Sequence, residues 1–276
     1  MPRLTSYKLL LNTPAIFYSL CISLSLSNIA YAQDSIFTIP APQNESYADF
    51  GVAGVVRDTY VGSGQSETLL LPYFKAEYKG RVFFKPGLGA GVYAVKNKDF
   101  RLSVSGNLSL GRDTEDTPFR NLDLDKDLLE IDTTVTALIA GRYYLPFGAI
   151  DVLGSIPVGG DLNGQRIDAL FTTEIKPFKN LRITPGVRTT YQSSGWVNSI
   201  YGLNDAQAEA LGNDTFDING QFATVGAHAV GYYQLPYNLE LIGFINYSRL
   251  IGDVQDSPLV DSNNGLTAAI GFARHF

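Results

Sequence analysis

Cysteine, methionine and histidine are almost absent from this sequence. Its 276 residues include one Cys, one Met and two His, and residues 33–276 contain neither Cys nor Met. That part of the chain therefore forms no disulfide and offers no thiolate or soft-sulfur chemistry. It also has no apolar run of about 18 residues, which excludes a helical membrane span.

The one long apolar run lies at the start, in residues 1–32. Arg3 and Lys8 precede a largely apolar stretch, and Ala30-Tyr31-Ala32 supplies an A-x-A cleavage pattern. We interpret this segment as a secretory signal peptide, in preference to a transmembrane anchor or a lipoprotein signal. The expected organisation is a cleaved signal peptide over 1–32, a periplasmic segment over 33–46 and one β-barrel over 47–276.

Basic residues are also scarce. Removing Arg3 and Lys8 from the 21 basic residues, against 27 acidic ones, leaves a net charge of −8 after cleavage. A nucleic-acid partner would need a basic stripe, so none is expected. Tyr and Phe occur 16 times each and Gly 27 times, while helix-favouring runs are few. The composition predicts an all-β protein, either a secreted sandwich or an outer-membrane barrel.

Several segments alternate between apolar and polar residues with a period of two. One example has Arg101, Ser103, Ser105, Asn107 and Ser109 on one face. The opposite face carries a set of mostly apolar residues: Phe100, Leu102, Val104, Gly106, Leu108 and Leu110. Strands of about 10 residues with this pattern are typical of a transmembrane barrel, whose outer face contacts lipid. A soluble sheet alternates as well, so the pattern alone leaves both architectures open.

The connections favour the barrel. Short Pro-containing turns at 145–148, 176–180 and 235–238 alternate with long polar loops at 58–67, 112–129, 193–219 and 252–264. Outer-membrane barrels have this asymmetry, with the short turns on the periplasmic side. Aromatic residues near the strand ends would form interfacial girdles: Tyr78, Tyr143, Tyr144, Phe178, Tyr232, Tyr233, Tyr237 and Tyr247.

We therefore predict an antiparallel up-and-down transmembrane β-barrel of about twelve strands. Ten is the alternative, since Lys85-Pro-Gly-Leu-Gly89 could be a bulge in one strand rather than a hairpin. The twelve expected strands lie near 48–57, 68–78, 81–86, 88–96, 100–111, 130–144, 148–157, 165–177, 180–192, 219–234, 238–250 and 264–276.

Charged residues of both signs fall on the face that should point into the barrel. Inside a narrow barrel such groups persist when they are paired or solvated. Two interpretations follow: a salt-bridged, mostly filled interior, or a small polar pore. The predicted inward set is Lys75, Glu77, Arg101, Asp132, Arg142, Arg166, Asp168, Glu174, Lys176, Arg182 and Arg188.

The last strand, which runs to Phe276, resembles the carboxyl-terminal signal of outer-membrane barrels. Alternation back from Phe276 places Phe272, Ile270 and Leu266 on the lipid face. Arg274 shares that parity, near the interface, where a charge costs only about 0–1 kcal/mol. We therefore expect the chain to reside in the outer membrane of a Gram-negative bacterium, in contact with its lipid bilayer and lipopolysaccharide.

Several short motifs resemble those of the MipA/OmpV family of outer-membrane proteins. They are Tyr247-Ser-Arg-Leu-Ile-Gly-Asp253, Asp256-Ser-Pro-Leu-Val260, Tyr201-Gly-Leu-Asn-Asp-Ala-Gln-Ala-Glu-Ala210, Leu71-Pro-Tyr-Phe-Lys-Ala-Glu-Tyr-Lys-Gly80, Phe83-Phe84 and Gly87-Leu-Gly-Ala-Gly91. The resemblance implies a non-enzymatic scaffold for murein turnover, with a lytic transglycosylase and a bifunctional murein synthase as partners. It implies no catalytic residues. A small-solute, porin-like channel is the alternative function, followed by a barrel hydrolase.

The residues suggest no catalytic, cofactor or metal site. His228 lies among Ala and Gly with no adjacent serine or carboxylate, and His275 is next to the end of the chain. Asp123-x-Asp125-x-Asp127 resembles the opening of a calcium loop, but Leu128 and Thr134 replace the required Gly and Glu. We interpret it as a solvated acidic loop. We expect no cofactor.

One helix is expected within the long loop at 193–219. Asn204 can cap a helix over residues 204–210, and Gln207 follows three residues later, as in a capping box. This helix would pack over the barrel mouth or act as a gate or docking element. Trp196, the only tryptophan, would anchor the same loop.

Overall fold

The computed structural model describes residues 46–109, 111–122, 125 and 128–276. The expected signal peptide and the segment 33–45 lie outside the described residues. The strands are β1 Tyr47–Asp58, β2 Ser66–Tyr78, β3 Val82–Lys85, β4 Gly89–Lys96, β5 Phe100–Ser109, β6 Thr134–Leu145, β7 Gly148–Pro157, β8 Arg166–Thr172, β9 Ile175–Phe178, β10 Leu181–Gln192, β11 Gln221–Leu235, β12 Leu239–Leu250 and β13 Asn264–His275.

These strands form one closed antiparallel sheet. Neighbours in sequence pair with each other, and β13 pairs with β1 to close the barrel. Both β8 and β9 pair with β10, so they are one interrupted strand and the barrel has the twelve strands that the sequence predicts. Pro185 of β10 faces the interruption, and its nitrogen has no hydrogen to donate to the ladder. Residues 82–96 form the predicted hairpin rather than a bulge.

Side chains alternate between the two faces of the wall as predicted. On β13, Leu266, Ile270 and Phe272 are half or more exposed on the outer face, while Gly271 and Ala273 are buried inside. Two expected girdle residues are exceptions, because Tyr144 and Tyr232 have the inward parity of their strands. Their rings lie against Arg101 and Arg142, and against Arg182. Tyr144 and Tyr232 therefore lie inside the barrel, where their rings contact arginine side chains, and are not part of the girdle.

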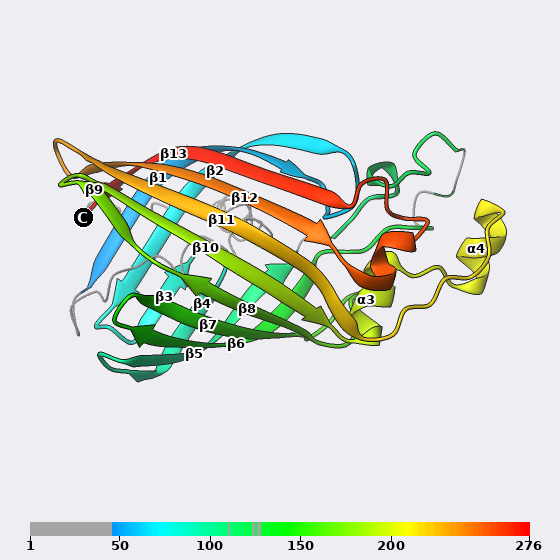
Figure 1. The fold of residues 1–276 in the computed structure, drawn as a ribbon, viewed down its shortest axis with the longest axis horizontal. Helices are drawn as coiled ribbons and strands as arrows, with labels where there is room; N and C mark the ends of the chain where they lie inside the picture. Colours follow the sequence, from blue (N-terminus) through cyan, green and yellow to red (C-terminus); the bar gives the residue numbers. More distant parts are fainter. Residues whose placement is uncertain (1–45, 110, 123–124, 126–127) are drawn as a thin grey trace, which may run out of the picture.

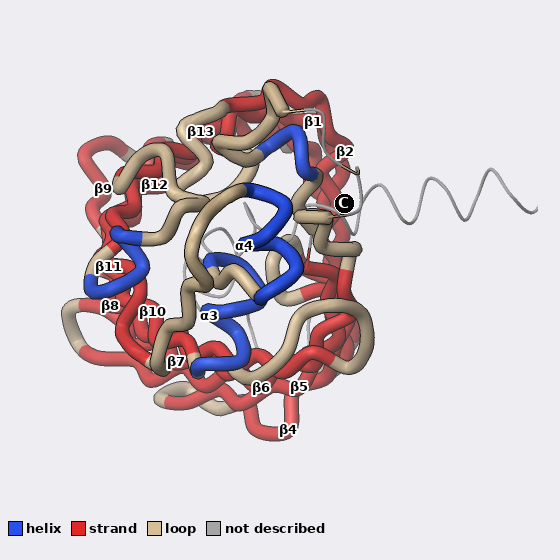
Figure 2. The backbone as a smooth tube through the Cα atoms, turned by 90° about the vertical axis from the view of Figure 1, so that its right-hand side faces the viewer, coloured by secondary structure: helices blue, strands red, loops and turns tan. Residues whose placement is uncertain are grey.

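The long connections fold into a cap at one end of the barrel, while the turns at 79–81, 97–99, 146–147, 179–180 and 236–238 lie at the other end (Figure 1). The cap contains two α-helices, α3 Ser194–Tyr201 and α4 Asp205–Leu211, and two short 3-10 helices, Thr114–Asp116 and Gly252–Asp256. Figure 2 shows α3 and α4 lying across the barrel mouth. No helix in the described part of the chain is long and apolar enough to cross a membrane.

The predicted helix is confirmed as α4, with its capping box. The Asn204 side chain accepts from the Gln207 N–H at 3.0 Å, and the Gln207 side chain accepts from the Asn204 N–H at 3.1 Å. Gly212 ends the helix with φ +64°, a conformation that glycine adopts without strain. The first helix, α3, was not predicted, because its sequence Ser-Gly-Trp-Val-Asn-Ser has no strong capping or periodic signal.

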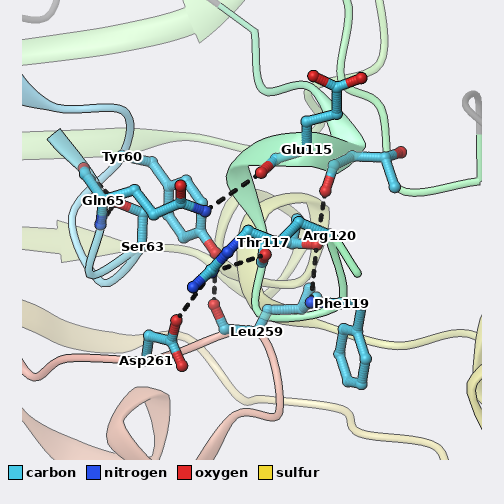
Figure 3. A network of polar contacts seen from close by, with 10 residues as sticks. Tyr60, Ser63, Gln65, Glu115, Thr117, Phe119, Arg120, Leu259 and Asp261 are labelled. Atoms are coloured by element: carbon cyan, nitrogen blue, oxygen red, sulfur yellow. Dashed lines mark hydrogen bonds and ion pairs between the residues drawn. The ribbon is translucent and has the colours of Figure 1, made fainter. Parts of the chain in front are cut away.

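Hydrogen bonds join the cap loops to one another (Figure 3). Tyr60 Oη donates to the Leu259 carbonyl at 2.6 Å, and Gln65 Nε2 donates to the Glu115 carbonyl at 3.1 Å. Tyr201 Oη donates to the Val61 carbonyl at 2.8 Å. Burial raises the pKa of both tyrosine hydroxyls, so they remain donors at neutral pH. The cap is therefore a folded unit in which distant loops hold each other.

Candidate functional site

Paired charges fill the barrel interior near the turn end. Arg142 donates to both carboxylate oxygens of Asp151, at 2.9 and 3.1 Å, and both side chains are almost fully buried. The Glu77 carboxylate forms one ion pair with Lys85 at 3.3 Å and a second one with Lys96. Arg142 and Asp151 come from the paired strands β6 and β7, and Glu77 and Lys85 come from the paired strands β2 and β3, while Lys96 lies one strand further, on β4. This arrangement matches the salt-bridged interior of the sequence analysis.

Three of the predicted inward charges lie elsewhere. Asp132 precedes β6 and is exposed among the loops. Glu174 and Lys176 flank the break between β8 and β9 and pair with each other at 2.8 Å, with Lys176 more than half exposed. The prediction failed for Asp132 because β6 begins only at Thr134. It failed for Glu174 and Lys176 because the break between β8 and β9 ends the strict alternation. The remaining eight predicted residues are buried or half-buried within the wall.

An apolar cluster occupies the middle of the barrel. It includes Leu138 and Leu153 from β6 and β7, and Val230 and Phe244 from β11 and β12, all 5% exposed or less. An open water-filled pore would leave such inward side chains exposed. The interior is thus a packed core with embedded ion pairs.

The turn end presents a different surface, here called the turn face. It comprises the turns at 79–81, 97–99, 146–147, 179–180 and 236–238, together with the short segment 174–178 that contains β9. Phe147, Phe178 and Tyr237 are 66%, 68% and 86% exposed on it. Tyr237 has φ +65°, which a bulky residue rarely adopts. Asn238 next to it has φ +58°, and two successive positive φ angles are what a type I′ hairpin turn requires. The geometry of the turn therefore accounts for the outward position of the Tyr237 ring.

Basic residues dominate the turn face. Its charged residues are Lys79, Arg81, Lys98, Lys176 and Lys179 against Asp99 and Glu174, an excess of three positive charges. These are the turns that the sequence places on the periplasmic side, and their positive charge contrasts with the negative net charge of the whole chain. A comparison of the charges in the short turns alone, instead of the net charge of the whole chain, would have identified these basic residues from the sequence.

The two histidines occupy separate places. His228 lies inside β11, 4% exposed, with its ring over Gly186 of β10, where a Cβ would lie 2.5 Å from Nε2. Its neighbour across the ladder to β12 is Asn246. His275 lies at the turn end, where Nδ1 contacts Asp49 Oδ1 at 2.6 Å. The contacts of these rings assemble no serine–histidine–carboxylate arrangement among the described residues.

Two residues of the calcium-like motif, Asp123 and Asp127, lie outside the described residues. Asp125 is exposed, as expected for a solvated acidic loop. Among the residues that the structure describes, no group of three or more His, Cys, Asp or Glu side chains could hold a metal ion.

Comparison with known proteins shows which family the chain resembles. The profile of the family "MltA-interacting protein MipA" matches residues 50–276. The "MltA-interacting protein" of Escherichia coli K12 is 24% identical over 216 residues, which are 76% of this chain and 82% of that protein. The "Putative outer membrane protein YiaT" of the same strain is 20% identical over 246 residues, covering 88% of this chain and 97% of that protein.

Solved structures with similarity to the chain include two outer-membrane proteins. The COG4313 outer membrane channel from Pseudomonas putida F1 has a TM-score of 0.40 and 12% identity, covering 87% of this chain and all of that one. The NanC porin has a TM-score of 0.40 and 9% identity, covering 82% and 98%. With the closed barrel and a family match over most of its length, this chain belongs to the MipA family of outer-membrane β-barrel proteins.

Proposed function

We propose that the protein is a non-enzymatic adaptor that holds murein-synthesising and murein-hydrolysing enzymes at the outer membrane through its turn face. The observation that carries this proposal is the turn face itself, which combines exposed aromatic rings with an excess of positive charge. In outer-membrane barrels the short turns face the periplasm, where murein lies. The name of the E. coli relative, MltA-interacting protein, supports a lytic transglycosylase as one partner, with a bifunctional murein synthase as a second.

Exposed aromatic residues and arginine are enriched where proteins bind one another. Tyr237 and Phe147 provide rigid apolar contact area, while Lys79, Arg81 and Lys179 would steer an acidic partner surface toward the turns. Lipid and lipopolysaccharide would surround the wall. The packed interior and the contacts of His228 support an adaptor over the alternatives of a channel and a barrel hydrolase.

Crosslinking in intact envelopes, followed by quantitative mass spectrometry, tests the docking face. The variant Lys79→Glu/Arg81→Glu/Lys179→Glu reverses three turn charges that are remote from the buried pairs. We expect it to lower recovery of lytic transglycosylase and murein synthase at least tenfold. The matched variant Asp205→Lys/Glu209→Lys/Asp214→Lys reverses three exposed charges of the cap and should leave recovery unchanged. Recovery of neither enzyme by the unmodified protein would refute the adaptor.

Planar-bilayer conductance distinguishes the adaptor from the channel. Because the middle of the barrel is packed, the refolded protein should give no discrete openings under voltage. Discrete openings that persist after purification would replace the adaptor proposal with a small-solute channel.

A further inference from the structure

An open groove of about 600 Å³ lies on the outer wall at the turn end, where β1, β2, β3 and β4 meet the last residue of β13's chain end. Most of its lining side chains have the outward parity of their strands. The outer wall of a transmembrane barrel contacts lipid, so this groove opens toward the lipid at the level of the short turns.

A row of alanines produces the groove. Ala48 of β1 lies opposite Ala76 of β2. Phe84 of β3 lies opposite Ala76 on one side and opposite Ala90 of β4 on the other. Three of the four side chains in this row across the wall are therefore single methyl groups, which leave a hollow beside the larger side chains around them. An apolar chain that lies along the wall can fill such a hollow.

Aromatic rings border the hollow. Phe74 and Phe84 both line it, with 5.3 Å between their ring centres. Tyr78 and Phe276 line it as well and are 58% and 65% exposed. Aromatic residues of this kind lie at the membrane–water interface, at the level of the headgroups. An occupant should thus have an apolar part against the alanines and a polar part near the turns.

Two cations lie beside this aromatic border. Lys79 Nζ is 5.1 Å from the ring centre of Tyr78, and the Arg274 guanidinium carbon is 5.3 Å from the ring centre of Phe276. Arg81 belongs to the same turn as Lys79. Long basic side chains at the membrane surface extend their charged ends toward the headgroups. The three cations therefore lie where a lipid in the groove would place its headgroup.

The acidic groups in this region do not cancel the three cations. The side chains of Asp49 and Glu77 are buried on the inner side of the wall, where lysines pair with them. Two further acidic groups count against the cations: the carboxylate of Phe276, the last residue, and Glu45, the residue before the described chain. Three positive charges against two negative ones leave an excess of one positive charge.

We propose that the groove binds one anionic phospholipid, such as phosphatidylglycerol, from the leaflet at the turn end. An acyl chain would lie over the alanine row between the rings, and the phosphate would contact Lys79 and Arg274. Phosphatidylethanolamine carries an ammonium group beside its phosphate, and the excess positive charge of the groove disfavours that group. The site thus selects among phospholipids by headgroup charge.

Native mass spectrometry of the refolded protein, released from detergent micelles, tests this site. Palmitoyl-oleoyl phosphatidylglycerol and palmitoyl-oleoyl phosphatidylethanolamine are titrated in parallel. One phosphatidylglycerol molecule should be retained at a concentration about fivefold lower than that needed for phosphatidylethanolamine, which is the contribution of one basic residue near an anionic surface. Equal retention of the two lipids, no retained lipid, or a lipid-free dimer, which would assign the groove to a second copy, would each overturn the proposal.

Variants locate the binding. Arg274→Gln should lower the affinity for phosphatidylglycerol about fivefold and reduce the preference over phosphatidylethanolamine. Ala76→Phe fills the hollow from the outer face and should lower retention of both lipids. Arg249→Gln, on the outer face of β12 near the cap, is the matched control and should retain lipid normally. If Arg274→Gln does not fold, Ala76→Phe decides: retention equal to that of the unmodified protein would refute the assignment.

Discussion

The two ends of this barrel differ in the exposure of their aromatic residues and in the sign of their surface charge. The cap buries its large aromatic residues, with Trp196 and Tyr201 only 1% and 3% exposed, and displays acidic groups. The turn face exposes Phe147, Phe178 and Tyr237 and displays basic groups. Exposed acidic residues of the described loops include Asp113, Glu115, Glu130, Asp132, Asp161, Asp205, Glu209, Asp214, Asp217, Asp253, Asp256 and Asp261.

Chain length explains the difference. The connections of the cap are long enough to fold against one another, and together with the adjacent strand ends they build three small apolar clusters. The turns of two or three residues at the turn face have no further chain that could cover a side chain, so Phe147 and Tyr237 remain exposed. The cap therefore buries its large aromatic side chains, whereas the turn face leaves its aromatic side chains exposed, at the surface where the proposed adaptor would bind its partners. At the turn end, buried ion pairs link strands of the interior, and removal of one partner of such a pair should be costly.

Arg142→Ala should have the largest effect on stability and tests this last point. It leaves Asp151, 2% exposed, as a buried charge without its bidentate partner. Loss of one member of such a pair costs about 3–5 kcal/mol. Urea unfolding in micelles, followed by circular dichroism, measures it.

The control is Lys98→Ala on the turn face. Lys98 also contacts a carboxylate, that of Asp99 at 3.8 Å, but both side chains are mostly exposed. Exposed pairs contribute little, so no measurable change is expected. Equal losses in the two variants would contradict the view that the interior, rather than the surface of the turns, stabilises this end.

Leu259→Ala should loosen the cap and leave the barrel folded. Leu259 is fully buried in a cluster with Leu129 and Leu203, and Leu→Ala changes in cores cost about 2–5 kcal/mol. Trp196 is the only tryptophan and lies in the cap, so its fluorescence reports the cap while circular dichroism reports the barrel. The fluorescence transition should move to lower urea than the circular dichroism transition.

Leu122→Ala removes a leucine from the same loop region that is 51% exposed, and its two transitions should match those of the unmodified protein. If both signals shift together in Leu259→Ala, the cap and the barrel unfold as one unit and the proposed division between the two ends is wrong.

Asn204→Ala should destabilise one helix of the cap by about 1 kcal/mol, because it removes the N-cap acceptor of α4. Hydrogen exchange of the α4 amides should accelerate by about fivefold, while amides of β10 and β11 keep their rates. Asn219→Ala, at an exposed position of the same long loop, is the control. An unchanged α4 in the Asn204 variant would show that packing alone holds this helix.

Much of the barrel could be read from the sequence, because strand alternation and turn chemistry are local. The twelve strands, the hairpin at 82–96 and the α4 capping box all follow from residues a few positions apart. Long-range contacts could not be read in this way. Arg57 and Gln192 line the same pocket inside the barrel, although more than a hundred positions separate them, and only the register of the closed sheet brings them together. Tyr144 and Tyr232 were misassigned because an aromatic residue at a strand end can serve either face.

Asp116→Asn should give the smallest effect and tests the acidic character of the cap. Burial, together with the nearby Asp113 and Glu67 carboxylates, raises the pKa of Asp116. The folded cap therefore binds this proton more tightly than the unfolded chain does, so its contribution to stability is lost as pH rises through the folded pKa. At neutral pH the ionised carboxylate of Asp116 therefore destabilises the folded cap. In the protein the Asp113 N–H donates to this carboxylate at 3.1 Å, and the amide oxygen of Asn can accept the same hydrogen bond without the charge.

At pH 7 the Asn variant should thus unfold at a slightly higher temperature than the unmodified protein. The gain in the free energy of unfolding should be less than about 1 kcal/mol, because Asp116 is only half-buried. The gain should disappear below the ordinary Asp pKa of about 3.9, where both carboxyl and amide are neutral. Trp196 fluorescence measures the transition in the cap, and Glu209→Gln, exposed on α4, is the control for loss of one negative charge. A gain of equal size at both pH values would mean that hydrogen bonding, and not the crowding of acidic groups, limits the stability of the cap.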